Sequence, residues 1–254
     1  MELITTENIY PDSLKPKEQE TFGDELYGLH ELIFCSGNKE IFLRYTVFSP
    51  ARRTKITVYR NTIGRLVGYF AIHHFHLRVA GERAIIMRGE GGFLEEYRHH
   101  HSSQRLILKE VVLLRIRHPF APLYTLSCFI SPVMYYVAVK DCYRLYPNRR
   151  LTTPERIFTI MQQLSEEFQL AEMDERYPYM RNVGWVVRYS AEKMASLSRT
   201  ANKDIRFFLE QNPRYHEGYG LLTMMPVTTL NVVLSAINFL LSLLGIKFKF
   251  RSKS

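Results

Sequence analysis

The feature that most constrains this chain is residues 83–117, where an apolar segment runs into a charged loop and then into a second apolar segment. Residues 84–87, Ala-Ile-Ile-Met, are typical of a buried strand, and apolar residues recur at helical spacing over residues 106–114. Ser102 or Ser103 is suited to cap that helix, and the free N–H groups of a first helical turn attract anions. We therefore expect the functional site where this strand meets this helix.

Turn and breaker residues divide the rest of the chain into further strands and helices. We expect a polar leading arm over residues 1–18 and a helix over residues 19–37. An antiparallel meander of strands is then expected over residues 41–48, 56–60, 66–78 and 83–94. After the central helix, Leu123–Phe129 is expected to be a strand, so the strand–helix–strand order predicts a parallel crossover and an α+β class. Later helices are expected from Ser131 to Asn148 and over residues 153–170, and later strands over 182–189 and 219–225.

Composition narrows the class of protein and of partner. The chain has 254 residues, 46% hydrophobic and 23% charged, which predicts one domain over residues 1–220 and a hydrophobic appendage over residues 221–254. A formal net charge of +9 favours anionic partners, but no basic run indicates nucleic acid, so we expect none. Cys35, Cys128 and Cys142 lack disulfide or metal-ligand spacing, and the first residues lack the pattern of a secretory signal, so a cytoplasmic protein is expected.

The order of strand, turn, strand, Tyr97-Arg98 with a polar loop, helix, strand and tyrosine-rich helix resembles the core of the GNAT superfamily of N-acyltransferases over residues 41–146. The resemblance implies a mixed, mostly antiparallel sheet flanked by helices, and a thioester donor such as acyl-CoA or an acyl carrier protein. In that family an Arg/Gln-x-x-Gly-x-Gly/Ala loop at the helix start holds the pyrophosphate of acyl-coenzyme A. The matching residues here, with a histidine in place of one glycine, are Arg98, His99, His100, His101, Ser102 and Ser103.

The resemblance also implies two catalytic groups. Family members carry a bulge in the fourth strand, and Gly89, Gly91 and Gly92 are suited to form one, with a loop between two short strands as the alternative. Glu90 is our first choice to take the proton from the attacking amine, if burial raises its pKa, and Tyr143 is our first choice to protonate the leaving thiolate. A surface carboxylate and aromatic packing are the competing explanations. Further candidates for these roles are Glu95, Glu96, Tyr135 and Tyr136.

Two groups of histidines raise the question of a metal site. Strand alternation puts His74 and His76 on one face and His73 on the other, and the three consecutive histidines at residues 99–101 cannot all point at one ion. We therefore expect no metal, and loop histidines that donate to phosphate or remain solvated. A Gly-x-Ser-x-Gly motif, a Walker loop and a dinucleotide fingerprint are missing from the sequence, which excludes those classes.

Residues 227–246 form an uncharged, apolar segment that is long enough, at about 1.5 Å per residue, to cross a bilayer. Basic residues alternate with phenylalanines just after it, over residues 247–253. We expect a peripheral or re-entrant helix on an anionic membrane surface, with a polar stripe toward head groups or a partner helix; burial against the domain is the alternative. The stripe consists of Thr228, Asn231, Ser235, Asn238 and Ser242.

Together these features predict an acyltransferase that moves an acyl group from a thioester donor to an amine near a membrane. One alternative is a non-catalytic GNAT-like module that binds an anionic ligand, a lipid surface or a protein partner, and His101 is the main argument for it. Membrane remodelling by the C-terminal helix is another. The sequence leaves the acyl length, the acceptor and the oligomeric state open, a homo-oligomer included.

Overall fold

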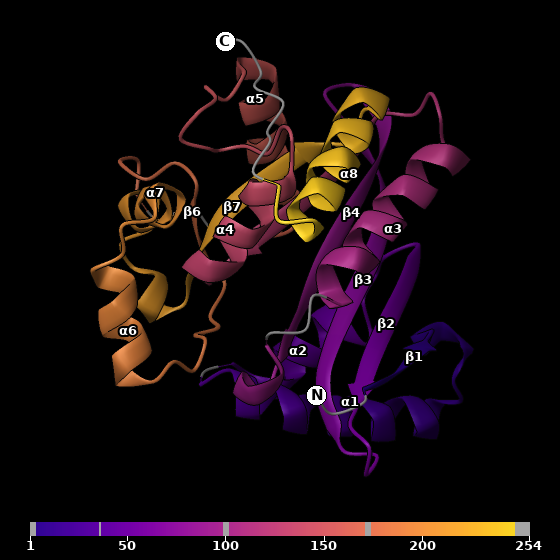
Figure 1. The fold of residues 1–254 in the computed structure, drawn as a ribbon. Coiled ribbons are helices and arrows are strands. Elements are labelled where there is room, and N and C mark those ends of the chain that lie inside the picture. The colour runs from indigo at the N-terminus through magenta and orange to yellow at the C-terminus, as the bar shows by residue number, and fades with distance from the viewer. Residues whose placement is uncertain (1–3, 36, 99–101, 171–173, 247–254) are drawn as a thin grey trace.

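The computed structural model describes residues 4–35, 37–98, 102–170 and 174–246. At its centre lies a seven-stranded sheet with the order β1-β2-β3-β4-β5-β7-β6 (Figure 1). Neighbouring strands are antiparallel except for β4 and β5, which are parallel. The strands are β1 (Thr5–Ile9), β2 (Arg53–Arg60), β3 (Leu66–Val79), β4 (Glu82–Phe93), β5 (Leu123–Phe129), β6 (Met180–Asn182) and β7 (Tyr219–Pro226).

The parallel pair confirms the predicted crossover, because helix α3 (Ser102–Arg117) carries the chain from the end of β4 back to the start of β5. A mixed, mostly antiparallel sheet with helices packed against it also confirms the α+β class. The other α-helices are α1 (Pro16–Ile33), α2 (Lys39–Thr46), α4 (Pro132–Asp141), α5 (Glu155–Glu167), α6 (Ala191–Ser198), α7 (Lys203–Gln211) and α8 (Thr229–Leu243). Three short 3-10 helices are η1 (Pro11–Ser13), η2 (Glu95–Tyr97) and η3 (Tyr215–Glu217).

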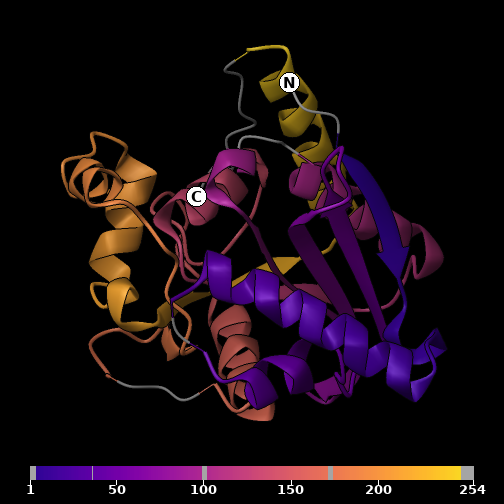
Figure 2. The ribbon, with the colours of Figure 1, turned by 90° about the horizontal axis from the view of Figure 1, so that it is seen from below.

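Helices cover both faces of the sheet (Figure 2), and strand alternation directs successive side chains to one or the other of these layers. On one face, Ile86 and Leu126 pack with Leu164 of α5, and α1 and α2 continue this layer beside β3 and β4. On the other face, Lys55 of β2 forms an ion pair with Glu110 of α3, and α8 lies beside α3. The two layers are called the α2 face and the α3 face below.

Residues 41–48, expected as a strand, lie mostly in helix α2 instead. The side-chain oxygen of Asn38 accepts two backbone N–H groups of the first turn, which caps the helix. Phe42 and Thr46 are one helical turn apart, and both are buried. The β-branched and aromatic composition of this segment therefore reflects the inner face of a short helix, and the cap decides its conformation.

Three further boundaries differ from the expectation. The leading arm contains β1, which is an edge strand with four of its five residues exposed and so lacks the alternation that marks a buried strand. Helix α4 ends at Asp141 rather than Asn148, because Tyr146 leaves the helix to bridge to Met224 of β7. Strand β6 ends at Asn182, and the chain that follows runs to the end of α1.

Helix α8 packs on the domain through its polar stripe. The Asn231 side chain donates to the carbonyls of Arg144 and Pro226 at 2.9 and 2.7 Å, and Ser235 Oγ accepts from the Tyr143 N–H at 2.9 Å. The stripe satisfies backbone groups near α4, so the alternative of burial against the domain is confirmed for Asn231 and Ser235, and the expectation that these residues face head groups is wrong. The outward face carries exposed apolar side chains instead, namely Leu230, Val233, Leu240, Leu243 and Leu244. Among the described residues, no helix has both the length and the apolar character needed to span a membrane.

Candidate functional site

Glu90 lies on the α2 face of β4, in contact with two polar side chains. Thr46 Oγ1 of α2 donates a hydrogen bond of 2.6 Å to Glu90 Oε1, and His73 Nε2 of β3 lies 3.4 Å from the same oxygen. The other ring nitrogen of His73, Nδ1, lies 3.0 Å from Thr54 Oγ1. These contacts follow from the ladder, since His73 pairs with Arg88 and so shares a face with Arg88 and Glu90.

The environment of Glu90 favours its charged form. Burial alone would raise the pKa of this carboxyl, but the hydrogen bond and charge of His73, the Thr46 hydrogen bond and the charge of Arg88 together lower it below the usual value. Burial thus acts in the expected direction, but the other contacts outweigh it, so the net rise in pKa that would have favoured Glu90 as a base is not found. A carboxylate that stays ionised at neutral pH can accept a proton or bind an ammonium group.

A cavity of about 250 Å³ opens beside Glu90, between β3, β4, the chain after α2 and the end of α5. Glu90 and His73 form its polar wall, the guanidinium groups of Arg44 and Arg88 add positive charge, and the exposed Glu167 adds a second carboxylate. Its aromatic walls are Tyr45, Phe75 and Phe168. The cavity thus combines a carboxylate–histidine pair, two cations and a second, exposed carboxylate with aromatic walls, which suits a small polar ligand.

The parallel ladder between β4 and β5 covers only part of β4. The paired residues run from Ile85↔Leu123 to Arg88↔Leu126, so the rest of β4, from Gly89 on, separates from β5. Backbone N–H and C=O groups on that edge are therefore free of β5 in the described structure, and they begin beside Glu90. Such an opening gives an extended ligand a place to bind to β4.

The glycines of β4 serve close packing. The β3–β4 register is continuous from Gly68↔Phe93 to Val79↔Glu82, so neither the expected bulge nor a loop interrupts it. A Cβ at Gly91 would lie 2.3 Å from the carbonyl oxygen of Tyr69, and a Cβ at Gly92 would lie 2.8 Å from Ile33. The backbone of β3 and helix α1 leave no room for side chains at these positions.

The predicted donor loop is only partly described. His99, His100 and His101 lie outside the described residues, and Ser102 and Ser103 begin α3. The Arg98 guanidinium donates to the Phe93 carbonyl at 3.2 Å and to the Arg188 carbonyl at 3.3 Å. Arg98 therefore joins the end of β4 to the chain after β6, and its role in donor binding stays a prediction.

The structure does not bring Tyr143 to Glu90. Tyr143 follows α4 and binds α8 through its N–H, on the α3 side of the sheet, whereas Glu90 faces α2. Tyr135 is buried, and its hydroxyl donates to the Pro147 carbonyl at 3.0 Å; burial raises its pKa. Glu95 lies in η2 with Glu96, beyond the end of β4. The catalytic assignments of Glu90 and Tyr143 stay predictions, and the geometry gives only Glu90 a polar cavity.

Sequence reasoning missed the partners of Glu90. His73 was separated from His74 and His76 by alternation, but the register that sets it beside Arg88 was not predicted. Pairing the two strands about the turn at Ala80-Gly81 would have found it. Thr46 gave no signal, because its segment was expected to be a strand. Among the described residues, no group of three or more histidine, cysteine or acidic side chains could hold a metal ion.

No protein-family model and no curated protein matches the chain. Partial likenesses to solved structures include an Enterococcus faecalis protein titled "Probable N-Acyltransferase", at 14% identity and TM-score 0.37, over 55% of this chain and 32% of that one. A GNAT family acetyltransferase from Elizabethkingia anophelis with acetyl-CoA bound is 16% identical, with TM-score 0.35, over 58% of this chain and 80% of that one. One from Brucella melitensis in complex with acetyl-CoA is 15% identical, with TM-score 0.33, over 55% and 82%.

The chain therefore spans about a third of the length of the E. faecalis protein. Likeness at these identities concerns the fold alone. The strand order of the chain itself, with α3 joining the parallel strands β4 and β5, is the mixed, mostly antiparallel arrangement that the sequence predicted.

Proposed function

We propose that this protein transfers an acyl group from a thioester donor, such as acyl-coenzyme A, to an amine. The observation that carries the proposal is the cavity on β4, in which Glu90 is hydrogen-bonded to Thr46 and faces His73. The opening between β4 and β5 begins one residue away, at Gly89. A donor bound along that edge and an amine in the cavity would meet beside a carboxylate, which is the arrangement that acyl transfer to an amine needs.

In the proposed reaction, the amine nitrogen attacks the thioester carbonyl carbon, a C–N bond forms, and the C–S bond breaks. The amine must lose one proton, and Glu90 takes it while His73, held by Thr54, orients and shares it. The departing thiolate takes up one proton, for which Tyr143 stays our candidate. Arg98 and residues 99–103 are the proposed site for the phosphates of the donor, because an anion is stabilised at the start of α3.

The test is transfer from acetyl-coenzyme A and octanoyl-coenzyme A to a panel of small amines, with the product detected by mass spectrometry. Glu90→Gln should lower turnover about a hundredfold or more, and His73→Asn should lower it too, since both remove the proton path. His76→Asn is the matched control, because His76 is exposed on the other face of β3. Full turnover by Glu90→Gln would rule out its role, and the absence of transfer to every amine would overturn the proposal.

A non-catalytic binding module is the second candidate. It is favoured by one observation, that the Arg98 guanidinium already bonds two backbone carbonyls and stacks near Tyr189, with Cζ 5.7 Å from the ring centroid. An arginine used in this way has fewer free donors for a pyrophosphate. Calorimetry that finds no binding of acetyl-coenzyme A, together with the absence of transfer to any amine, would support this candidate.

We also propose that the protein associates peripherally with an anionic membrane surface. Support comes from the outward face of α8, with Leu240 and Leu244, and from exposed Ile116 and Phe120 at the end of the neighbouring α3. Exposed Arg105, Lys109 and Arg117 lie on the same helix α3, so apolar and basic side chains share one side of the molecule.

A further inference from the structure

The cavity beside Glu90 contains two cations that lack acidic partners. Arg88 Cζ lies 4.3 Å from the centroid of the Phe168 ring, and Arg44 Cζ lies 5.1 Å from that of Tyr45. Among the described residues, neither guanidinium lies within 4 Å of a carboxylate oxygen. Both are held by aromatic rings with N–H groups left to donate, which is a suitable setting for a ligand carboxylate.

Of the two carboxylates that line the cavity, Glu167 is exposed at the end of α5, and the more buried Glu90 lies close to Arg88. Glu90 follows Arg88 by two positions on β4, so the two side chains point to the same face from backbone positions about 6.6 Å apart. One small molecule can therefore contact both. A ligand with an amine and a carboxylate satisfies both charges, whereas a simple amine leaves the arginines unpaired and a simple anion faces the charge of Glu90.

We propose that the acceptor is a small zwitterion, an amino acid or a similar compound, with its amine at Glu90 and its carboxylate at Arg88 and Arg44. This inference rests on the proposed acyl transfer. The volume of about 250 Å³ admits a molecule of amino-acid size, and Phe75 and Phe168 provide an apolar wall for its side chain. The product is the N-acyl amino acid: the ammonium group loses two protons as the C–N bond forms and the C–S bond breaks, one proton passing through Glu90 to solvent and the other to the sulfur, which leaves as a free thiol.

The test compares each amino acid with its amide, which keeps the amine and loses only the carboxylate charge. Binding of leucine, leucinamide, phenylalanine and phenylalaninamide to the full chain is measured by calorimetry without any donor, and transfer from acetyl- and octanoyl-coenzyme A is measured separately. We expect the amino acids to bind at least tenfold more tightly than their amides. Where transfer occurs, kcat/KM should be higher for each amino acid than for its amide, mainly because KM is lower.

Arg44→Gln and Arg88→Gln should each weaken leucine binding about tenfold and leave leucinamide binding nearly unchanged. Arg65→Gln is the matched control, because Arg65 is exposed in the turn between β2 and β3, away from the cavity. Arg44 is at the surface of α2, so its variant is expected to fold, and circular dichroism checks both.

The outcomes separate the inference from the proposed function. Equal binding and equal transfer for leucine and leucinamide would overturn the proposal that the acceptor is a zwitterion, but would not contradict the proposed acyl transfer. Arginine-dependent leucine binding with no transfer from either donor would support the zwitterion site and count against the acyltransferase. An absence of binding and of transfer would overturn both.

Discussion

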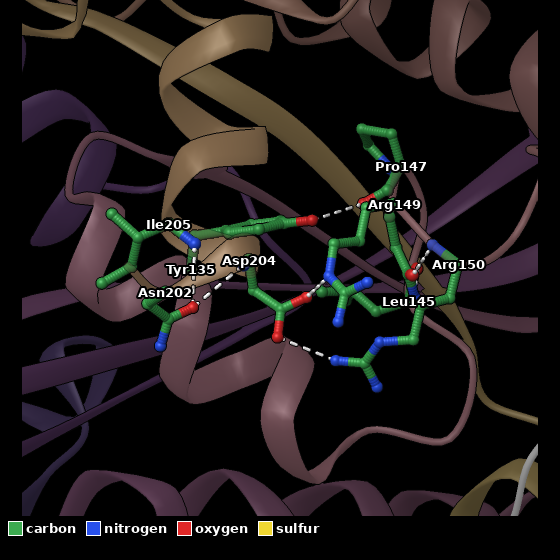
Figure 3. A network of polar contacts seen from close by, with 9 residues as sticks. Tyr135, Leu145, Pro147, Arg149, Arg150, Asn202, Asp204 and Ile205 are labelled. Atoms are coloured by element: carbon green, nitrogen blue, oxygen red, sulfur yellow. Dashed lines mark hydrogen bonds and ion pairs between the residues drawn. The ribbon is translucent and has the colours of Figure 1, made fainter. Parts of the chain in front are cut away.

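Arg149 Nε donates a hydrogen bond of 2.7 Å to Asp204 Oδ1, which joins the chain after α4 to the first turn of α7 (Figure 3). Arg150 Nη2 donates to the other carboxylate oxygen at 2.8 Å. Close by in the same view, Tyr135 of α4 donates to the Pro147 carbonyl, so α4, the chain that follows it and the distant helix α7 are held at one place. Only 7% of Asp204 is exposed, so its carboxylate depends on these partners.

We expect Asp204→Ala to lower the free energy of unfolding by about 2 kcal/mol. Removing one partner from a buried pair costs about 3–5 kcal/mol, but both arginines are about one-third exposed, which reduces the loss. Urea denaturation followed by circular dichroism measures it. Asp24→Ala is the control, since Asp24 pairs with Lys39 at the surface and should change stability by less than about 1 kcal/mol. Equal losses in the two variants would contradict this account of the Asp204 network.

Stability should also fall in mild acid, because buried histidines are held neutral. His30 is packed against Trp185 with ring centroids 4.6 Å apart, and burial lowers its pKa from 6.5 to about 4. The unfolded chain therefore binds more protons than the folded one between about pH 4 and 6.5, so the stabilisation is complete above pH 6.5 and is lost as the pH falls toward 4. At about 1.4 kcal/mol for each pKa unit, the loss reaches up to about 3 kcal/mol.

The measurement is the urea midpoint at a series of pH values from 4 to 7.5. His30→Gln removes the titration and should flatten the profile between pH 4.5 and 6.5, whatever it costs in absolute stability. His216→Gln is the control, because His216 is exposed. A variant of His30 with the slope of the wild type would show that the acid sensitivity arises elsewhere; His74, whose pKa burial also lowers to about 4, is then the next residue to test.

Gly91→Ala should destabilise the protein by about 1–3 kcal/mol, since a Cβ at this position would lie 2.3 Å from a backbone oxygen of β3. Gly28→Ala is the matched control: Gly28 lies inside α1, and a Cβ there meets no heavy atom within 4 Å. Alanine is favoured over glycine in a helix by about 1 kcal/mol, so the control should gain stability. Thermal unfolding distinguishes the expected loss of stability in Gly91→Ala from the expected gain in Gly28→Ala. An unchanged stability of Gly91→Ala would mean that β3 and β4 can separate at little cost.

The outward face of α8 should control binding to anionic vesicles. Replacing Leu240 and Leu244 by serine should lower co-sedimentation with phosphatidylserine-containing vesicles at least tenfold, because both leucines are exposed and their loss removes apolar burial in lipid. Ile63→Ser, at an exposed isoleucine in the turn between β2 and β3, is the control. Equal binding by all three proteins, or none by the wild type, would count against membrane association.

The class of fold was predictable because its signals are local. The apolar run of β4, the cap at Ser131 and the segment that became β5 each mark an element without reference to the rest of the chain. Helix α2 and strand β1 were missed for complementary reasons. For α2, the β-branched and aromatic residues favoured a strand in the prediction, although Asn38 is a helix cap. For β1, the polar residues of an exposed edge strand gave no alternating pattern from which its pairing could be predicted.

The site was harder to predict, because it depends on register and on which face of the sheet a residue occupies. Glu90 was identified as a candidate, but its partners Thr46 and His73 come from elements whose placement the sequence did not reveal. The same contacts reversed the expected direction of its pKa shift. Tyr143 was assigned to a helix that was expected to run to Asn148, whereas α4 ends at Asp141, so Tyr143 lies just beyond the helix.

Because Asn231 and Ser235 hold α8 to the domain, the helix cannot swing out as a tether. If its leucines contact lipid, the whole domain must bind with the α3 face against the membrane. The cavity beside Glu90, which is on the α2 face, would then open into water on the side away from the bilayer. A molecule that reaches this carboxylate would arrive by diffusion from solution, and a lipid head group lying under the protein would be on the wrong side of the sheet.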